Sequence, residues 1–178
     1  MKKYLAYYET EWPANIAELT AVKNKPFVGY LNGEGVKFTV IPEPVVGPAD
    51  NEIWYTSSNG YTVYPSDMPG VSLVSNEYNN GKGVITFDVP LTSIGGRAFE
   101  ACTSLTSVTI PNSVTSIGLG AFYDCSSLTS VTIPNSVTSI GYYAFAYCDG
   151  PIYITFEGTI EQWNSITKGE GWNAESYI

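Results

Sequence analysis

A 23-residue repeat runs through the second half of this sequence and restricts its folds more than any other feature. The phrase "SLTSVTIPNSVTSIG" begins at Ser104 and recurs letter for letter from Ser127. Four columns of residues recur at the same interval: Ile94, Ile117 and Ile140; Ala98, Ala121 and Ala144; Phe99, Phe122 and Phe145; Cys102, Cys125 and Cys148. A repeat this short cannot bury its apolar residues alone, so successive copies must stack on one another.

Each copy has the pattern of two extended segments followed by a turn. Residues 107–110 alternate between polar and apolar side chains, which predicts a short strand, and Pro111 ends it. A second extended run is predicted over 113–117. The spacing of Phe122 and Cys125 then predicts one helical turn that faces the core.

Copies of lower fidelity extend the repeat in both directions. The segment "VITFDVPLTSIGGRAFEAC" is an earlier copy over 84–102, and "YITFEGTI" begins a later one at 153–160. We therefore expect about 3.5 rungs of 23 residues in a solenoid.

The pattern L-x-x-V-x-I-P-x-x-V-x-x-I-G-x-x-A-F-x-x-C resembles the BspA-like (Treponema pallidum type) class of leucine-rich repeats. The match is close over 84–148 and looser to about residue 178. The resemblance implies a right-handed coil with a parallel strand stack on one face, found in bacterial surface proteins of the mouth and gut that bind host proteins or other cells, and also in phage-borne genes. It supplies no catalytic residues. The fold class that we expect is an α/β leucine-rich repeat solenoid with one-turn helices, preceded by a small β-rich region.

Composition and turn residues divide the chain into five expected parts. A small N-terminal β unit over 1–41 is followed by a proline-rich linker over 42–50 and a β-hairpin flank over 51–80. The leucine-rich repeats occupy 81–158, and a cap helix with a tail occupies 159–178.

Three hairpins are expected before the repeats. Residues 25–42 are one candidate. A second is expected over 52–65, turning at Asn59-Gly60. The third turns near Gly81, and its first strand is expected to cover the edge of the first repeat copy.

A short helix is expected after the repeats. Thr159 and Gln162 have the spacing of a capping box. On this helix Trp163 is expected to close the open end of the core, with a contribution from Trp172. Stacking of these tryptophans on a carbohydrate is the functional alternative.

The sequence offers little material for catalysis. It contains no histidine, which removes Ser-His-Asp and Cys-His catalysis and the commonest zinc sites. Carboxylates do not recur at matching repeat positions, so neither a glycosidase pair nor a calcium ladder is indicated. The three cysteines are expected to be buried as small hydrophobic residues. Their redox state stays open, because stacking would place neighbouring cysteine Cα atoms about 5 Å apart. We predict no enzyme, no cofactor and no metal.

Charge and hydropathy limit the partners and the compartment. The chain carries 8 Lys plus Arg against 17 Asp plus Glu, without a basic cluster, so no nucleic acid is expected. No run approaches the roughly 20 apolar residues of a membrane span. The apolar run of residues 4–8 is too short for a signal peptide. We expect a cell-surface or secreted protein if an export signal was removed, and otherwise a virion-associated or cytoplasmic one.

Two candidate contact surfaces remain. One is a threonine row on the outward face of the strand stack: Thr86, Thr109, Thr132 and Thr155. Threonine is also a favoured residue for an exposed strand, which is the structural alternative. The other is a tyrosine patch where the copies differ: Tyr123, Tyr142, Tyr143 and Tyr147. Exposed tyrosine suits interfaces because a rigid ring provides contact area at little entropic cost.

The predicted function is a non-catalytic interaction or adhesion module that binds a host protein or glycan. The alternative is a structural or receptor-binding protein of a phage virion or tail. Proteins of this kind are usually symmetric oligomers. Homo-oligomerisation therefore also stays open.

Overall fold

The computed structural model describes residues 27–28, 41–42, 47–66, 68 and 70–173. The chain divides into two compact units, Met1–Val46 and Gly47–Ile178. In the first unit, strands β1 (Phe27–Val28) and β2 (Ile41–Pro42) pair antiparallel, as the hairpin candidate over 25–42 requires. The rest of the N-terminal β unit predicted over 1–41 lies outside the described residues.

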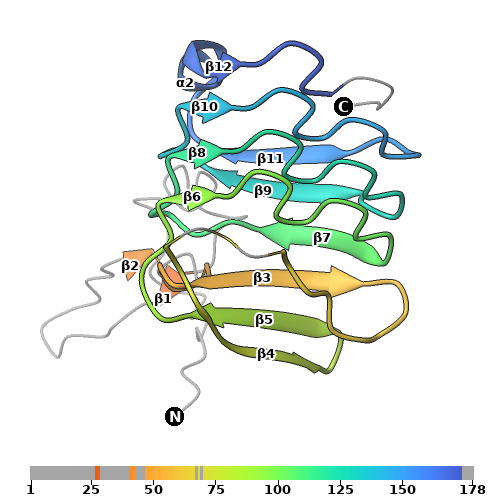
Figure 1. The fold of residues 1–178 in the computed structure, drawn as a ribbon. Coiled ribbons are helices and arrows are strands. Elements are labelled where there is room, and N and C mark those ends of the chain that lie inside the picture. Colours follow the sequence, from red (N-terminus) through yellow and green to blue (C-terminus); the bar gives the residue numbers. More distant parts are fainter. Residues whose placement is uncertain (1–26, 29–40, 43–46, 67, 69, 174–178) are drawn as a thin grey trace, which may run out of the picture. The chain divides into compact units, whose positions relative to one another are not determined.

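The larger sheet of the second unit has six strands in the order β11-β9-β7-β3-β5-β4. Strands β7, β9 and β11 are parallel and lie in register at the 23-residue interval, with Thr109 opposite Thr132 and Thr132 opposite Thr155. The repeat stack predicted from the sequence is therefore present in this sheet (Figure 1). The strand bounds are β3 (Glu52–Ser57), β4 (Leu73–Asn79), β5 (Lys82–Phe87), β7 (Leu105–Thr109), β9 (Ser130–Pro134) and β11 (Tyr153–Glu157).

The second extended segments of the copies form a smaller sheet of four short parallel strands. Its order is β12-β10-β8-β6, and Figure 1 shows these arrows stacked above one another. Each strand is two residues long, since the chain turns away at the following glycine. The bounds are β6 (Ser93–Ile94), β8 (Ser116–Ile117), β10 (Ser139–Ile140) and β12 (Thr167–Lys168).

The third segment of each copy folds as consecutive turns, and the predicted one-turn helix is wrong. Over residues 118–125 the N–H of Tyr123 bonds the carbonyl oxygen of Gly120, three residues back, at 3.0 Å. An α-helix would bond four residues back. The intervening N–H of Phe122 donates instead to Ala144 of the next copy at 2.8 Å. Bonds between copies thus replace the bonds within a helix.

Strand β3 lies between β5 and β7, where the sequence places the first and second copies side by side. Trp54 pairs with Val84 on one side and with Thr109 on the other, in both cases antiparallel. Strands β6 and β8 nevertheless remain direct neighbours. A local fit favours the pairing of β3 with β5. The buried ring of Tyr55 on β3 covers Gly83 on β5, where a larger residue would collide with the ring.

The hairpin predicted over 52–65 is therefore wrong. Gly60 does adopt a positive φ of 74°, as a turn requires, but β3 takes both of its partners from elsewhere in the chain. The hairpin at Asn80-Gly81 is confirmed, since β4 pairs antiparallel with β5 across these two residues, which both have positive φ. Strand β5 of the first copy therefore has β4 on one edge and β3 on the edge that faces the second copy.

The core is a set of columns that run through the stack. The rings of Phe99, Phe122 and Phe145 are fully buried and lie 5.2 Å apart between centroids, with interplanar angles of 4° and 3°. Such regular stacking follows from identical residues at identical positions in each copy.

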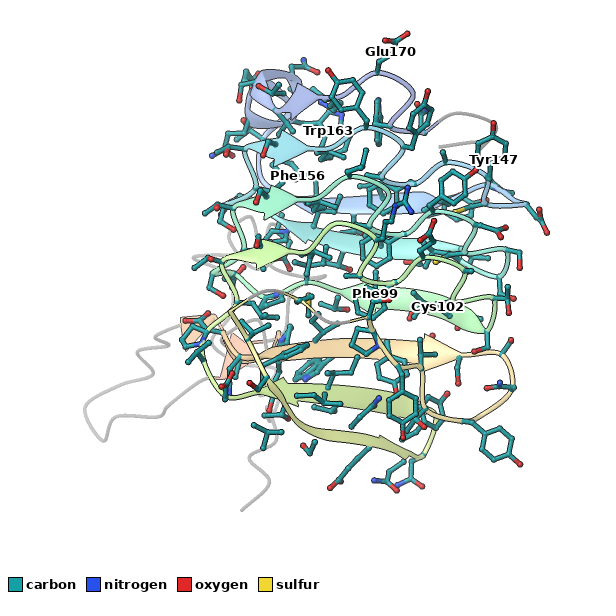
Figure 2. The ribbon with its side chains drawn as sticks, in the orientation of Figure 1. Phe99, Cys102, Tyr147, Phe156, Trp163 and Glu170 are labelled. Carbon is teal, nitrogen blue, oxygen red and sulfur yellow. The ribbon has the colours of Figure 1, made fainter. Side chains whose placement is uncertain are left out.

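Helix α2 (Ile160–Ser165) and two tryptophans close the C-terminal end of this core. The predicted capping box is confirmed: Thr159 accepts from the N–H of Gln162, whose side chain accepts from the N–H of Thr159. Trp163 lies beside Phe156 (Figure 2), with 5.4 Å between the ring centroids. Its ring centroid is 6.1 Å from that of Trp172. The tryptophans therefore have the plugging position expected from the sequence.

Candidate binding surface

The four candidate tyrosines lie on the consecutive turns at one side of the stack. Tyr142, Tyr143 and Tyr147 are 56%, 44% and 46% exposed, and Tyr123 is half-buried. Figure 2 shows Tyr147 at the outer side of these turns. The turns point these side chains away from the core because the intervening alanine and phenylalanine positions point inward.

Three of the tyrosines line a groove of about 320 Å³, which we call the tyrosine groove. The rings of Tyr123 and Tyr147 lie 5.1 Å apart at an angle of 49°. Tyr142 is not among the residues that line the groove. The full lining is Arg97, Glu100, Leu119, Gly120, Tyr123, Tyr143 and Tyr147.

Arg97, Glu100 and Leu119 are groove residues that the sequence analysis did not select. The groove is hollow because the column formed by Arg97, Gly120 and Tyr143 has no side chain at its middle position. Comparing the copies column by column would have revealed this gap. Glu100 approaches the Arg97 guanidinium at 3.8 Å, and both side chains are partly exposed. An exposed pair at this distance contributes little to stability.

Two of the groove tyrosines have a backbone conformation that glycine normally adopts. Tyr143 and Tyr147 have φ values of 56° and 59°, in the left-handed region. Gly120, at the position equivalent to Tyr143, has a φ of 57°. Left-handed backbone costs a residue with a side chain about 1 kcal/mol or more. Arg97, Ala101 and Asp124, at the equivalent positions of earlier copies, have φ values of 58°, 56° and 56°, so this conformation belongs to the turns of every copy.

The groove tyrosines also differ from the tyrosines of the N-terminal flank in their hydroxyl groups. Tyr55 donates to Asn76 Oδ1 at 2.7 Å, and Tyr78 accepts from the N–H of Ser57 at 3.2 Å. Within the described part of the chain, no hydrogen bond engages the hydroxyls of the four candidate tyrosines. These hydroxyls remain open to a ligand.

The threonine row is shorter than predicted. Thr109, Thr132 and Thr155 lie side by side on the outward face of the larger sheet. Thr86 pairs with Glu52 of β3, so the inserted strand separates it from the row. Beside the row, Lys82 Nζ lies 3.0 Å above the centre of the Trp54 ring.

The cysteines form a column of thiols inside the stack. Cys125 and Cys148 are buried as expected, whereas Cys102 is half-buried. Burial, with the neighbouring thiols Cys102 and Cys148, raises the pKa of Cys125, and burial also raises the pKa of Cys102. Raised pKa values disfavour the reactive thiolate. The column therefore has the character of a structural core.

Neither a metal-holding group of side chains nor a membrane-spanning helix is present among the described residues. No group of three or more cysteine and carboxylate side chains among them is placed to hold a metal ion. Within the same part of the chain, no helix is both long enough and apolar enough to span a bilayer.

The C-terminal segment continues the later copy that the sequence predicts to begin at 153–160. Thr167 pairs with Ser139, and the N–H of Phe145 donates to the Trp172 carbonyl at 2.7 Å. An added Cβ at Gly169 would lie 2.5 Å from the backbone nitrogen of Tyr142, so only glycine fits there. Helix α2 lengthens the interval between the first and second strands of this copy, so its second half falls outside the 23-residue period.

Several solved structures of leucine-rich repeat proteins are similar to this chain. A leucine rich cell surface protein from Faecalibacterium prausnitzii A2-165 is 37% identical over 44% of this chain and 21% of its own length, with a TM-score of 0.42. The T. pallidum leucine rich repeat protein is 25% identical over 48% of each chain, with a TM-score of 0.38. A leucine-rich repeat protein from Bacteroides ovatus ATCC 8483 is 24% identical over 50% of this chain and 28% of its own, with a TM-score of 0.27.

The chain thus spans between 21% and 48% of the length of these three proteins. No curated protein matches it. A family model described as the BspA type leucine rich repeat region (6 copies) matches residues 75–167, just over half of the chain. On this match, which agrees with the repeat pattern and with the stacked parallel strands, the chain belongs to the BspA type leucine-rich repeat family.

Proposed function

We propose that this protein is a non-catalytic interaction module of the bacterial cell surface, which binds a host protein or glycan through the tyrosine groove. The observation that carries the proposal is the gathering of exposed tyrosine rings at one groove. Tyr143 and Tyr147 line the groove, and both present large rings to solvent. Exposed tyrosine rings suit a binding surface, since they offer large contact area at little entropic cost.

Support also comes from the family, whose proteins serve as interaction modules, and from the surface location of the F. prausnitzii relative. Tyr142 extends the same surface beside the groove. The row of Thr109, Thr132 and Thr155 is a second contact face in this proposal, because it is flat and rich in hydroxyl groups.

The test is binding of the full chain to an array of host matrix proteins and glycans. The test variant replaces Tyr123, Tyr142, Tyr143 and Tyr147 with serine. A matched control replaces Tyr61 and Tyr153, which are 74% and 72% exposed and lie outside the groove. We expect a specific ligand that the control variant keeps and the test variant loses. A ligand kept by both variants would rule out the tyrosine surface.

A second candidate function is that of a self-assembling particle component. The outer edges of β4 and β11 pair with no strand in the described part of the chain. Unpaired strand edges can be extended by another chain. Light scattering tests this candidate: a defined oligomer supports it, and a monomer at all concentrations rules it out.

A further inference from the structure

We propose that the tyrosine groove binds one acidic sugar residue, whose carboxylate pairs with Arg97. The inference rests on the proposed function, because it assigns a ligand class to the same surface. It begins from the charges that surround the groove.

Arg97 is the only arginine of the sequence and the least engaged cation among the described residues. Lys82 lies over the ring of Trp54, and Lys168 Nζ donates to the Trp163 carbonyl oxygen at 2.8 Å. The Arg97 side chain is 66% exposed, and its contact with Glu100, at 3.8 Å, is too long for a hydrogen bond. A guanidinium carries five N–H donors in a planar fork that matches a carboxylate. Arg97 therefore has donors to offer an anion in the groove.

The rings and hydroxyls of the groove suit a sugar. Because the rings of Tyr123 and Tyr147 are tilted by 49°, a flat ligand can stack on only one of them. The phenol hydroxyls can both donate and accept, as the hydroxyls of a sugar require. The volume of 320 Å³ is near the lower limit for small-molecule sites, about 300 Å³. The groove thus has room for one sugar ring.

A substitution of Glu100 tests the proposal, because an acidic ligand and a neutral or cationic one should change their affinity in opposite directions. The Glu100 carboxylate lies beside Arg97 and repels a second carboxylate there. Replacing it with glutamine should therefore strengthen binding of an acidic sugar. If Glu100 instead accepted a bond from a neutral sugar or paired with a cationic partner, the same change would weaken binding.

The experiment measures dissociation constants of the full chain by calorimetry for N-acetylneuraminic acid, D-glucuronic acid and, as the uncharged match, D-glucose. The two acids distinguish a sialic acid from a uronic acid as the source of the carboxylate. We expect at least one acid to bind, and glucose to bind at least about tenfold more weakly, since hydrogen bonds to charged groups are strong. The variant Arg97→Gln should lose about tenfold or more of the affinity for the acid. The variant Glu100→Gln should gain affinity.

Lys82→Gln is the matched control, because it removes the same charge on the outward face of the larger sheet and should leave sugar binding unchanged. Thermal unfolding of each variant verifies that it is folded. Equal binding of glucose and the acids, or an unchanged affinity in Arg97→Gln, would overturn the inference. So would the absence of sugar binding. If protein ligands are then still lost in the four-tyrosine variant, the proposed function stands and only the sugar assignment fails.

Discussion

The thiol of Cys125 donates a hydrogen bond to the carbonyl oxygen of Phe99, 3.0 Å away in the preceding copy. Cys148 has the same relationship to Phe122, at 3.5 Å. At the start of the stack, Cys102 donates to Tyr64 of the N-terminal flank instead, at 3.7 Å. The thiol column therefore links successive copies as a donor, which requires that each thiol keeps its proton.

Stability should fall as the pH rises above about 8.5, the ordinary pKa of a cysteine. The pKa of Cys125 is raised in the folded protein, mainly by burial, so the unfolded chain releases this proton first. Above that pH the unfolded state binds fewer protons than the folded state, and the free energy of unfolding decreases with pH. Urea unfolding from neutral pH to about pH 9 measures the onset of the decline, in a range below the ordinary pKa of tyrosine, about 10. Cys125→Ala should flatten the decline, and an unchanged slope would contradict this origin.

Replacing Gly118 with alanine should destabilise the protein by about 2 kcal/mol or more, as overpacking does. The added Cβ would lie 2.7 Å from the backbone nitrogen of Gly96, and backbone atoms of a neighbouring copy cannot move away freely. Gly47→Ala is the control, because no atom lies within 4 Å of its added Cβ. Chemical denaturation of both variants gives the comparison. Equal stability of the two would show that the copies are not packed this closely.

Tyr143→Asn should leave the protein as stable as before or raise its free energy of unfolding by up to about 1 kcal/mol, because asparagine tolerates the left-handed region. Tyr142 is the matched control, since it lies next in the chain without a positive φ. Tyr142→Asn should bring no gain. The difference between the two variants in urea unfolding measures the cost of the left-handed backbone at position 143. A larger gain at position 142 would refute this cost.

Thr159→Ala should cost about 1 kcal/mol of stability through the loss of the helix cap. Thr159→Ser keeps the oxygen that accepts from the N–H of Gln162 and should stay close to the wild type. Hydrogen exchange should show the loss in helix α2 first, because the helix holds Trp163 over the end of the core. Faster exchange confined to the N-terminal flank would argue against this role.

The repeat stack could be predicted because the 23-residue period alone determines which residues form a column and which residues pair between neighbouring strands. Once residues 23 apart are known to stack, the pairing of Thr109 with Thr132 follows, as does the burial of Phe122 between Phe99 and Phe145. The outward position of the tyrosines follows in the same way, since the inward positions are already assigned. The capping box at Thr159 was predictable because it is a local signal.

The errors have physical causes of two kinds. The partners of β3 are set by contacts between distant residues, such as Tyr55 over Gly83, which no local pattern displays. The turns resemble a helix in the sequence because Ala121 and Phe122 suit either structure. Gly120 was the clue to the turn, as glycine readily adopts a positive φ. The groove was missed because it depends on the side chain that Gly120 lacks.

The position of β3 also bears on how the molecule is synthesised. Trp54 leaves the ribosome well before its partner Thr109, which lies 55 residues further along the chain. Until that partner emerges, one edge of β3 stays uncovered on the nascent chain, and uncovered edges invite wrong pairing. Once β7 docks on this edge, each later copy finds a finished template beside it. The coil should therefore grow from its N-terminal flank towards its C-terminus, in the direction of translation.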